Sequence, residues 1–262
     1  MGANRYLGID VGSTASKVVV IDDEGNIVSK GLSSSGAGTP GPKIALEAAF
    51  AGNDMSMEDI TASCSTGYGR NLLEWTDYQM SELSCHAKGA AKLFPGVHTV
   101  IDIGGQDAKV LSVDDEGMLQ NFVMNDKCAA GTGRFLDVMA GVFGCKVSDL
   151  AGYDAEATEI AEISSTCTVF AESEVISKLA AGTPIPNIVA GIHTSVASRT
   201  CGLARRLGVR PKVAMTGGVA LNSGMRRRLE QKLGEQIATS ELSQFNGALG
   251  AALFAQAKAS KA

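Results

Sequence analysis

The sequence predicts an α/β protein built from two similar lobes, and two observations support that prediction. The first is a repeat: residues 9–27 read IDVGSTASKVVVIDDEGNI and residues 101–119 read IDIGGQDAKVLSVDDEGML, so nine of nineteen positions are identical without a gap. Ordinary composition gives about one or two identities by chance. The second is the composition, with 45% hydrophobic residues, 5% aromatic residues and 31 glycines. This mixture suits strands and helices that are joined by many tight turns.

Each copy of the repeat is expected to form a strand, a glycine turn, a second strand, and an Asp-Asp-Glu-Gly hairpin turn into a third strand. The glycine turns offer backbone N–H groups to an anion, and the first copy adds the hydroxyls of Ser13, Thr14 and Ser16. Asp10 and Asp102 stand at strand ends just before these turns, where carboxylates can hold a hydrated Mg²⁺ ion. The two copies therefore predict a nucleotide that is bound at its phosphates from both lobes.

A third glycine element follows later in the chain. Residues 213–222 read VAMTGGVALN, which predicts a buried strand, a turn at Gly217 and Gly218, and then a helix. Residues 246–255 read NGALGAALFA and predict a closing helix of small residues, whose glycines and alanines allow other helices to approach closely.

Two cysteines lie in segments that a nucleotide site does not explain. Cys128 stands in the polar run NDKCAAGTGRFLD, before a predicted helix, and Cys167 opens an amphipathic helix in SSTCTVFAESEVISKL, where Ser165 and Thr166 are typical N-cap residues. Burial in the core is the usual fate of a free cysteine. The polar turns favour a different role, because the N-terminus of a helix lowers the pKa of a thiol. A [4Fe–4S] cluster needs four thiolates, so two per chain are half a set that a twofold axis completes.

The net charge and the distribution of apolar residues exclude some classes of function. A net charge of −5 argues against nucleic-acid binding. We expect neither a signal peptide nor a membrane span, so the chain is predicted to be cytoplasmic, with reduced thiols.

Several conspicuous side chains are interpreted as structural. We expect the triplet Arg226–Arg228 to form a solvated helix face. Lys17 and Lys109 match across the repeat, and each either reaches phosphate or is a solvated strand residue. The remaining cysteines are predicted to be structural: Cys64, Cys85, Cys145 and Cys201. The three histidines look isolated in the sequence and are predicted to be structural or surface residues: His86, His98 and His193.

The three glycine turns, in this order, resemble the phosphate-1, phosphate-2 and adenosine motifs of the acetate and sugar kinase, heat-shock-70 and actin superfamily. The resemblance implies two actin-like (ribonuclease H-like) lobes of mixed sheet flanked by helices, with ATP or ADP and Mg²⁺ in the cleft. It implies that residues 1–97 plus 246–262 form the first lobe and residues 98–245 form the second, which carries the cluster cysteines. The catalytic residues expected are Asp10, Asp102 and Gln106. The residues expected to bind the nucleotide are Gly12, Ser13, Thr14, Ala15, Ser16, Gly104, Gly105, Gly217, Gly218 and Gln244.

A closer resemblance covers essentially the whole chain. The runs IDVGSTASK, CSTGYGRN, MSELSCHAKGA, NDKCAAGTGRFLDVMA and ISSTCTVFAESEVIS closely match the activator ATPases of 2-hydroxyacyl-CoA dehydratases. That resemblance implies a homodimer in which Cys128 and Cys167 of each chain ligate one shared [4Fe–4S] cluster. It also implies that ATP drives a one-electron transfer to the dehydratase, with ferredoxin or flavodoxin as the donor.

Three other functions stay open at this stage. One is the ATPase subunit of a system like benzoyl-CoA reductase, and another is a nucleotide-dependent scaffold of the actin type. The third is a small-molecule kinase, in which Asp107 is the general base; equally, Gln106 orients a hydrolytic water. The sequence does not identify the acyl-CoA, because the dehydratase would select it.

Overall fold

The computed structural model describes residues 4–52, 55–164 and 167–261 as two compact units. The first unit comprises Met1–Gly96, Val113–Leu119 and Gln244–Ala262, and the second comprises Val97–Ser112 and Gln120–Ser243. Each unit is described by itself below.

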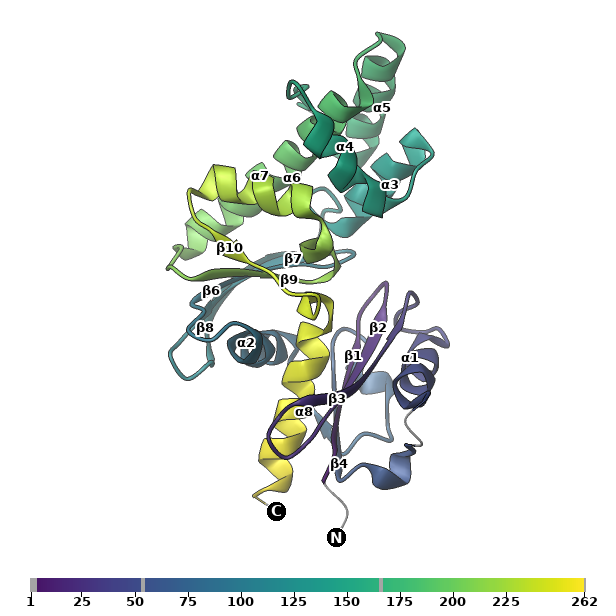
Figure 1. Ribbon diagram of the computed structural model, residues 1–262, viewed down its shortest axis with the longest axis vertical. Helices are drawn as coiled ribbons and strands as arrows, with labels where there is room; N and C mark the ends of the chain where they lie inside the picture. The colour runs from purple at the N-terminus through teal and green to yellow at the C-terminus, as the bar shows by residue number, and fades with distance from the viewer. Residues whose placement is uncertain (1–3, 53–54, 165–166, 262) are drawn as a thin grey trace. The chain divides into compact units, whose positions relative to one another are not determined.

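The first unit contains a five-stranded mixed sheet in the order β3-β2-β1-β4-β5 (Figure 1). Strand β1 pairs antiparallel with β2 and parallel with β4. Its elements are β1 (Tyr6–Val11), β2 (Ser16–Ile21), β3 (Ile27–Ser33), α1 (Gly41–Phe50), β4 (Ala62–Thr66), β5 (Tyr78–Gln79), α2 (Glu82–Leu93) and α8 (Asn246–Ala259), with short 3₁₀ turns at Met57–Asp59 and Arg70–Leu72.

The sheet of the second unit has the order β10-β9-β6-β7-β8, which repeats the first order strand for strand when it is read from the other end. Strand β6 pairs antiparallel with β7 and parallel with β9, as β1 does with its neighbours. The elements are β6 (Thr99–Ile103), β7 (Ala108–Val113), β8 (Leu119–Asn125), α3 (Gly133–Phe143), α4 (Leu150–Glu156), α5 (Thr168–Ala180), α6 (Ile185–Leu207), β9 (Val213–Thr216), α7 (Ser223–Leu233) and β10 (Ile237–Ala238), with 3₁₀ turns at Val147–Asp149 and Gly218–Leu221. A further 3₁₀ turn, Ser243–Phe245, begins at the last residue of this unit and continues into the first unit.

The two sequence repeats form the same local structure, which confirms the predicted strands and turns. In the first hairpin turn the Asp22 N–H donates to the Asn26 carbonyl at 3.0 Å; in the second, Asp114 and Met118 make the same bond at the same distance. Gly25 and Gly117 adopt φ values of 75° and 76°. That left-handed conformation is open to glycine without a steric cost, which explains the glycine at the fourth position of both turns.

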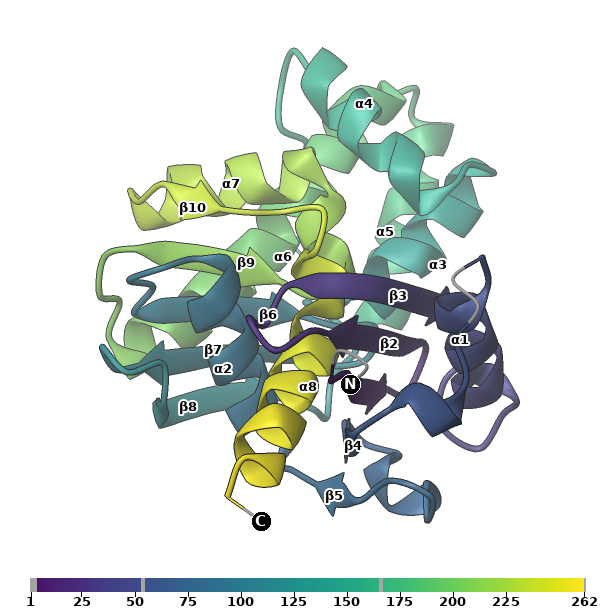
Figure 2. The ribbon, with the colours of Figure 1, turned by 60° about the horizontal axis from the view of Figure 1, so that its bottom comes forward.

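Helices cover both faces of the first sheet (Figure 2). Alternate residues of β1, such as Leu7 and Ile9, pack with α1 in one apolar cluster. Gly8 points to the other face, where a Cβ atom would overlap the backbone of α8 at Ala248. The predicted close approach of the closing helix is confirmed, because a Cβ on Gly89 of α2 would also overlap the α8 backbone.

In the second unit, α6 and α7 pack on the sheet in one core that includes Ile101, Met215, Ile192 and Leu229 (Figure 1). Helices α3, α4 and α5 extend this core, with α4 on α6 and α3 against α5. No helix in the described ranges is long and apolar enough to cross a membrane.

The arginine triplet does not form a solvated helix face, so that prediction was wrong. Asp154 of α4 is 2% exposed, and the side chains of both Arg227 and Arg228 pair with its carboxylate. Burial raises the pKa of Asp154, but hydrogen bonds from His193 and Arg228 outweigh burial and hold the pKa below its usual value. Arg227, Arg228 and His193 therefore belong to a buried ionic network that joins α4, α6 and α7, while Arg226 donates to the Thr239 hydroxyl.

Candidate functional site

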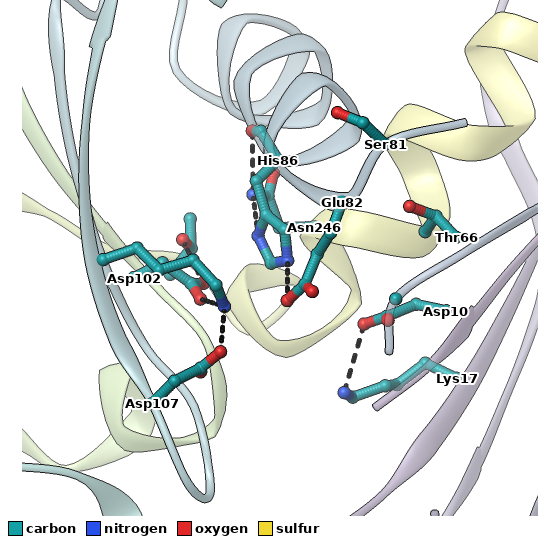
Figure 3. Close-up of polar contacts among 12 residues, drawn as sticks. Asp10, Lys17, Thr66, Ser81, Glu82, His86, Asp102, Asp107 and Asn246 are labelled. Carbon is teal, nitrogen blue, oxygen red and sulfur yellow. Dashed lines mark hydrogen bonds and ion pairs between the residues drawn. The ribbon is translucent and has the colours of Figure 1, made fainter. Parts of the chain in front are cut away.

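The first predicted phosphate turn lies between β1 and β2, and its acid is already paired with a lysine. Asp10 stands opposite Lys17 in the strand register, and Lys17 Nζ lies 3.2 Å from Asp10 Oδ2 (Figure 3). Asp10 is only 4% exposed, and the Lys17 side chain is 15% exposed. Lys17 is thus not a solvated strand residue. It compensates the charge of a buried carboxylate, which would otherwise be costly to bury.

The turn itself is closed by the Gly12 N–H, which donates to the Ala15 carbonyl at 3.0 Å. Ser13 and Thr14 are exposed, as a ligand-binding turn requires. The hydroxyl of Ser16 is different: it is buried and donates to the Ser35 carbonyl at 2.9 Å. Of the three predicted hydroxyls, those of Ser13 and Thr14 are therefore presented to solvent.

The second predicted phosphate turn, between β6 and β7, repeats the arrangement with more partners. Lys109 Nζ lies 3.4 Å from Asp102 Oδ2 and 2.8 Å from Asp107 Oδ2 (Figure 3). The Thr216 hydroxyl donates to Asp102 Oδ1 at 2.7 Å. Lys109 is 2% exposed, so it too is no solvated residue, while Gln106 at the tip of the turn is exposed.

The backbone of this second turn holds the start of helix α3, a connection that the sequence analysis missed. The Gly133 N–H donates to the Gly104 carbonyl at 2.8 Å, and the Arg134 N–H donates to the Gly105 carbonyl at 2.7 Å. A Cβ atom on Gly133 would lie 3.0 Å from the Gly104 oxygen, so glycine permits this close approach. The first N–H groups of a helix have no partner within the helix, and here the turn supplies them.

The third glycine turn lies at the end of β9. Gly217 has a φ of 84°, its N–H donates to the Ser243 carbonyl at 3.1 Å, and a Cβ there would overlap the carbonyl of Ile103 on β6. Gly218 is exposed and begins a 3₁₀ turn. In the first unit, Gln244 is half-buried just before α8.

Cys128 and Cys167 are both exposed, each close to the start of a helix. Cys128 lies in the loop before α3, and its carbonyl accepts from Asn125 Nδ2 at 2.8 Å. Cys167 is itself the N-cap of α5, where its thiol makes no capping hydrogen bond to the described backbone. Ser165 and Thr166, the predicted cap residues, lie outside the described residues. Cys167 precedes the first helical residue, Thr168, and does not lie in the first turn as predicted.

These two thiols fit part of a metal–sulfur site. Within the described residues of one chain, no group of three or more His, Cys, Asp or Glu side chains could hold a metal ion. Two exposed thiols at adjacent helices make up half of the thiolate set of a [4Fe–4S] cluster.

The BadF/BadG/BcrA/BcrD ATPase family matches residues 7–255. This chain belongs to that family. It is 59% identical over 256 residues to the (R)-2-hydroxyglutaryl-CoA dehydratase activating ATPase of Acidaminococcus fermentans, and the match covers 97% of this chain and 98% of that protein.

Solved structures extend the comparison. The activator of the 2-hydroxyisocaproyl-CoA dehydratase from Clostridium difficile, solved with bound ADPNP, superposes with a TM-score of 0.96 at 50% identity and covers 98% of this chain and 96% of that chain. A glucokinase from Streptomyces griseus superposes with a TM-score of 0.58 at 14% identity, covering 98% and 100% of the two chains. At that identity the likeness concerns the fold alone, and it confirms the predicted actin-like class.

In this member of the BadF/BadG/BcrA/BcrD ATPase family, the other cysteines are packed into the two units. Burial raises the pKa of Cys64 to about 12, and burial also raises the pKa values of Cys85 and Cys201. Cys145 is partly buried against the core of the second unit, and burial raises its pKa as well. These thiols stay protonated at neutral pH, as expected for structural cysteines.

His86 is not the isolated residue that the sequence suggested. It is 6% exposed, and its ring contacts Glu82 one helical turn earlier and Asn246 at the start of α8 (Figure 3). The Glu82–His86 spacing was visible in the sequence, but the contact with Asn246 was not.

Proposed function

We propose that this chain is the activator ATPase of a 2-hydroxyacyl-CoA dehydratase, and that ATP binding and hydrolysis drive the transfer of one electron onto the dehydratase. The two relatives described above are activators of such dehydratases, and both match this chain over nearly its whole length. They serve different acyl-CoA substrates, so the likeness supports the reaction class and leaves the acyl group open.

The phosphate turns of the two units are the proposed contacts for ATP or ADP with Mg²⁺. Asp10 and Asp102 are buried, ion-paired carboxylates that hold the metal ion and its waters, and Gln106 orients the attacking water. The relative with bound ADPNP supports a nucleotide ligand. The proposed backbone and side-chain contacts are Gly12, Ser13, Thr14, Ala15, Ser16, Gly104, Gly105, Gly217, Gly218 and Gln244, with Ser16 acting through its backbone because its hydroxyl is occupied.

The proposed redox cofactor is one [4Fe–4S] cluster per homodimer, which supplies one-electron chemistry when bound. Cys128 and Cys167 provide two thiolates from each chain. The first turns of α5 expose large apolar side chains beside Cys167, with Val169 66% and Phe170 70% exposed, which supports a face that is covered by a second copy. Ferredoxin or flavodoxin is the proposed electron donor, and the cytoplasm is the proposed compartment.

The observation that carries the coupling is the contact between the second phosphate turn and α3. The carbonyls of Gly104 and Gly105 accept the first N–H groups of the helix that follows Cys128. A displacement of this turn when it binds or releases the γ-phosphate therefore acts directly on the loop that carries the cysteine. The dipole of a helix stabilises nearby negative charge, so moving α3 changes the environment of a reduced cluster.

The test is anaerobic and uses the purified holoprotein. Iron capture by bathophenanthroline and the reduction potential of the cluster are measured without nucleotide, with ADP, and with ADPNP. We expect ADPNP, but not ADP, to speed iron capture and to lower the potential. Identical rates and potentials in all three states would contradict the coupling, and colourless protein without iron would contradict the cluster itself. Adding candidate dehydratases with ATP and a reductant then identifies the acyl-CoA.

A further inference from the structure

A buried polar cluster in the first unit has no role in the function proposed so far. Asn246 is fully buried, and its side-chain nitrogen Nδ2 lies 3.2 Å from His86 Nδ1 and 3.0 Å from the His86 carbonyl oxygen (Figure 3). Glu82 Oε1 lies 3.7 Å from the other ring nitrogen, His86 Nε2. The three residues join the start of α2 to the start of α8.

These contacts determine where the histidine carries its proton. An amide nitrogen has two hydrogens, and Asn246 directs one to the His86 carbonyl and the other to Nδ1. Nδ1 must then accept, so a neutral ring carries its hydrogen on Nε2. The arrangement leaves Asn246 Oδ1 buried with no hydrogen-bond partner among the described residues. A buried acceptor without a partner is unfavourable. The two hydrogen bonds from Asn246 to His86 are therefore made at the expense of this oxygen.

The Nε2 atom of His86 lies near two carboxylates: that of Glu82, at 3.7 Å, and that of the predicted metal-binding acid Asp10. A Cβ atom built on Gly247 would lie 3.1 Å from Asp10 Oδ2 and 3.1 Å from His86 Nε2. The two atoms are therefore at most 6.2 Å apart, twice that distance, on the same side of α8. A single water with two hydrogen bonds of about 2.8–3.0 Å at its near-tetrahedral angle joins atoms that are about 4.5–5 Å apart, which this limit allows. Glycine at position 247 keeps a side chain out of this space.

We propose that His86 and Asn246 are positioning residues for the Asp10 carboxylate. Asn246 fixes the hydrogen of His86 on Nε2, and Nε2–H donates to a water that in turn donates to Asp10 Oδ2. Because Lys17 also contacts Oδ2, the carboxylate is then held in one orientation from two sides. This inference rests on the proposed nucleotide function, since it adds an outer support to an acid that is proposed to hold Mg²⁺.

The first test reads the histidine directly and needs no nucleotide. The chain has three histidines, so the ring signals of ¹⁵N-histidine-labelled protein are few enough to assign with His86→Gln. We expect His86 to show the Nε2–H tautomer, and Asn246→Ala to release that preference. An Nδ1–H tautomer in the unaltered protein would overturn the proposal.

The second test compares two replacements of the ring in the holoprotein. Gln places an amide close to the position of Nε2, whereas Asn reaches only that of Nδ1. The readout is the gain in ADP affinity when Mg²⁺ replaces EDTA. We expect His86→Asn to reduce this gain by about tenfold, as is typical when an outer support of a metal ligand is lost, and His86→Gln to retain most of it.

Gly247→Ala places a methyl group 3.1 Å from both atoms and so competes with a bridging water, and we expect it to behave like His86→Asn. Gly202→Ala in α6 is the matched control, because no other group lies within 4 Å of a Cβ there. Thermal unfolding midpoints exclude misfolded variants. If Mg²⁺ raises the ADP affinity of both His86→Asn and Gly247→Ala as much as that of the unaltered protein, the proposal is overturned. If the unaltered protein gains nothing from Mg²⁺, the proposed nucleotide site fails, and the positioning role fails with it.

Discussion

The hairpin β1–β2 and the hairpin β6–β7 have the same sequence pattern and the same registered Asp–Lys pair, yet their surroundings differ. Asp10 and Lys17 form a pair beside a turn whose Ser13 and Thr14 are exposed. Lys109 instead contacts two carboxylates, those of Asp102 and Asp107. The second turn also accepts the first N–H groups of α3.

The difference shows that the repeated sequence determines only the local structure: the paired strands, the turn and the Asp–Lys pair. The strand register fixes the Asp–Lys pair in both copies, but different segments bind the two turns. The loop residue Ala37 donates to the Gly12 carbonyl, whereas the start of α3 donates to Gly104 and Gly105. The first turn is open to a ligand, whereas the second is also a structural support for the segment with Cys128. Four predictions test this division.

The largest effect is expected at the cysteines, one of which, Cys128, precedes the helix that the second turn supports. Cys128→Ser and Cys167→Ser should each remove iron from both subunits of the dimer, because each chain supplies only two thiolates. Cys145→Ser is the control and should retain iron, since its thiol is packed against the core. Iron analysis of anaerobically purified protein measures this; retention of about four irons per dimer in all three variants would exclude these ligands.

The two lysines should differ in their contribution to stability. Lys109→Met leaves two carboxylates without their cation, one of them 1% exposed, and should lower the free energy of unfolding by about 3–5 kcal/mol. Lys17→Met affects one carboxylate at a more exposed pair and should cost about 1–3 kcal/mol. Urea unfolding measures the loss of unfolding free energy in both variants. Equal losses would show that the two Asp–Lys pairs contribute equally to stability.

Both acids of the repeat should be needed for ATP hydrolysis. Asp10→Ala and Asp102→Ala should each lower the hydrolysis rate by about a hundredfold, since a metal ion supplies several kcal/mol to such reactions. Iron content should not change, because the cluster ligands lie elsewhere in the sequence. Hydrolysis at the original rate in either variant would show that its hairpin does not hold the metal.

The smallest effect is expected where the second turn meets α3. Gly133→Ala places a Cβ 3.0 Å from the Gly104 oxygen, so the turn or the helix must shift by a few tenths of an ångström. We expect ATP hydrolysis to persist while the ADPNP-dependent increase in iron capture falls. Gly141→Ala on the same helix meets no atom within 4 Å and should leave both readouts unchanged. A normal ADPNP response in Gly133→Ala would argue against coupling through these bonds.

The sequence was sufficient for features that depend on neighbouring residues. The glycine turns and the Asp-Asp-Glu-Gly turns predicted the six strands of the two repeats, and the order of the three glycine turns predicted the fold. The Gly217–Gly218 turn and the helix with Met225 and Leu229 were found for the same reason.

The errors concern contacts between distant segments, which leave no periodic pattern. Arg228 meets Asp154 across 74 positions, so a run of arginines looked like a solvated surface. His86 meets Asn246 across 160 positions, and it looked isolated. The bonds from Gly104 and Gly105 to α3 involve only backbone atoms, so no residue type signals them. Apolar packing decides which segments meet, and the sequence alone does not display that choice.

The packing of α8 constrains the order in which the two units can be completed during synthesis. The helix fits against Gly8 of β1 and Gly89 of α2 with almost no space between the backbones, yet it follows the second unit in the sequence. Domains generally fold as units while the chain emerges from the ribosome. The sheet of the first unit, however, lacks one of its covering helices until the second unit has also been made. The acid of its glycine turn therefore gains its complete surroundings only after synthesis of the second unit.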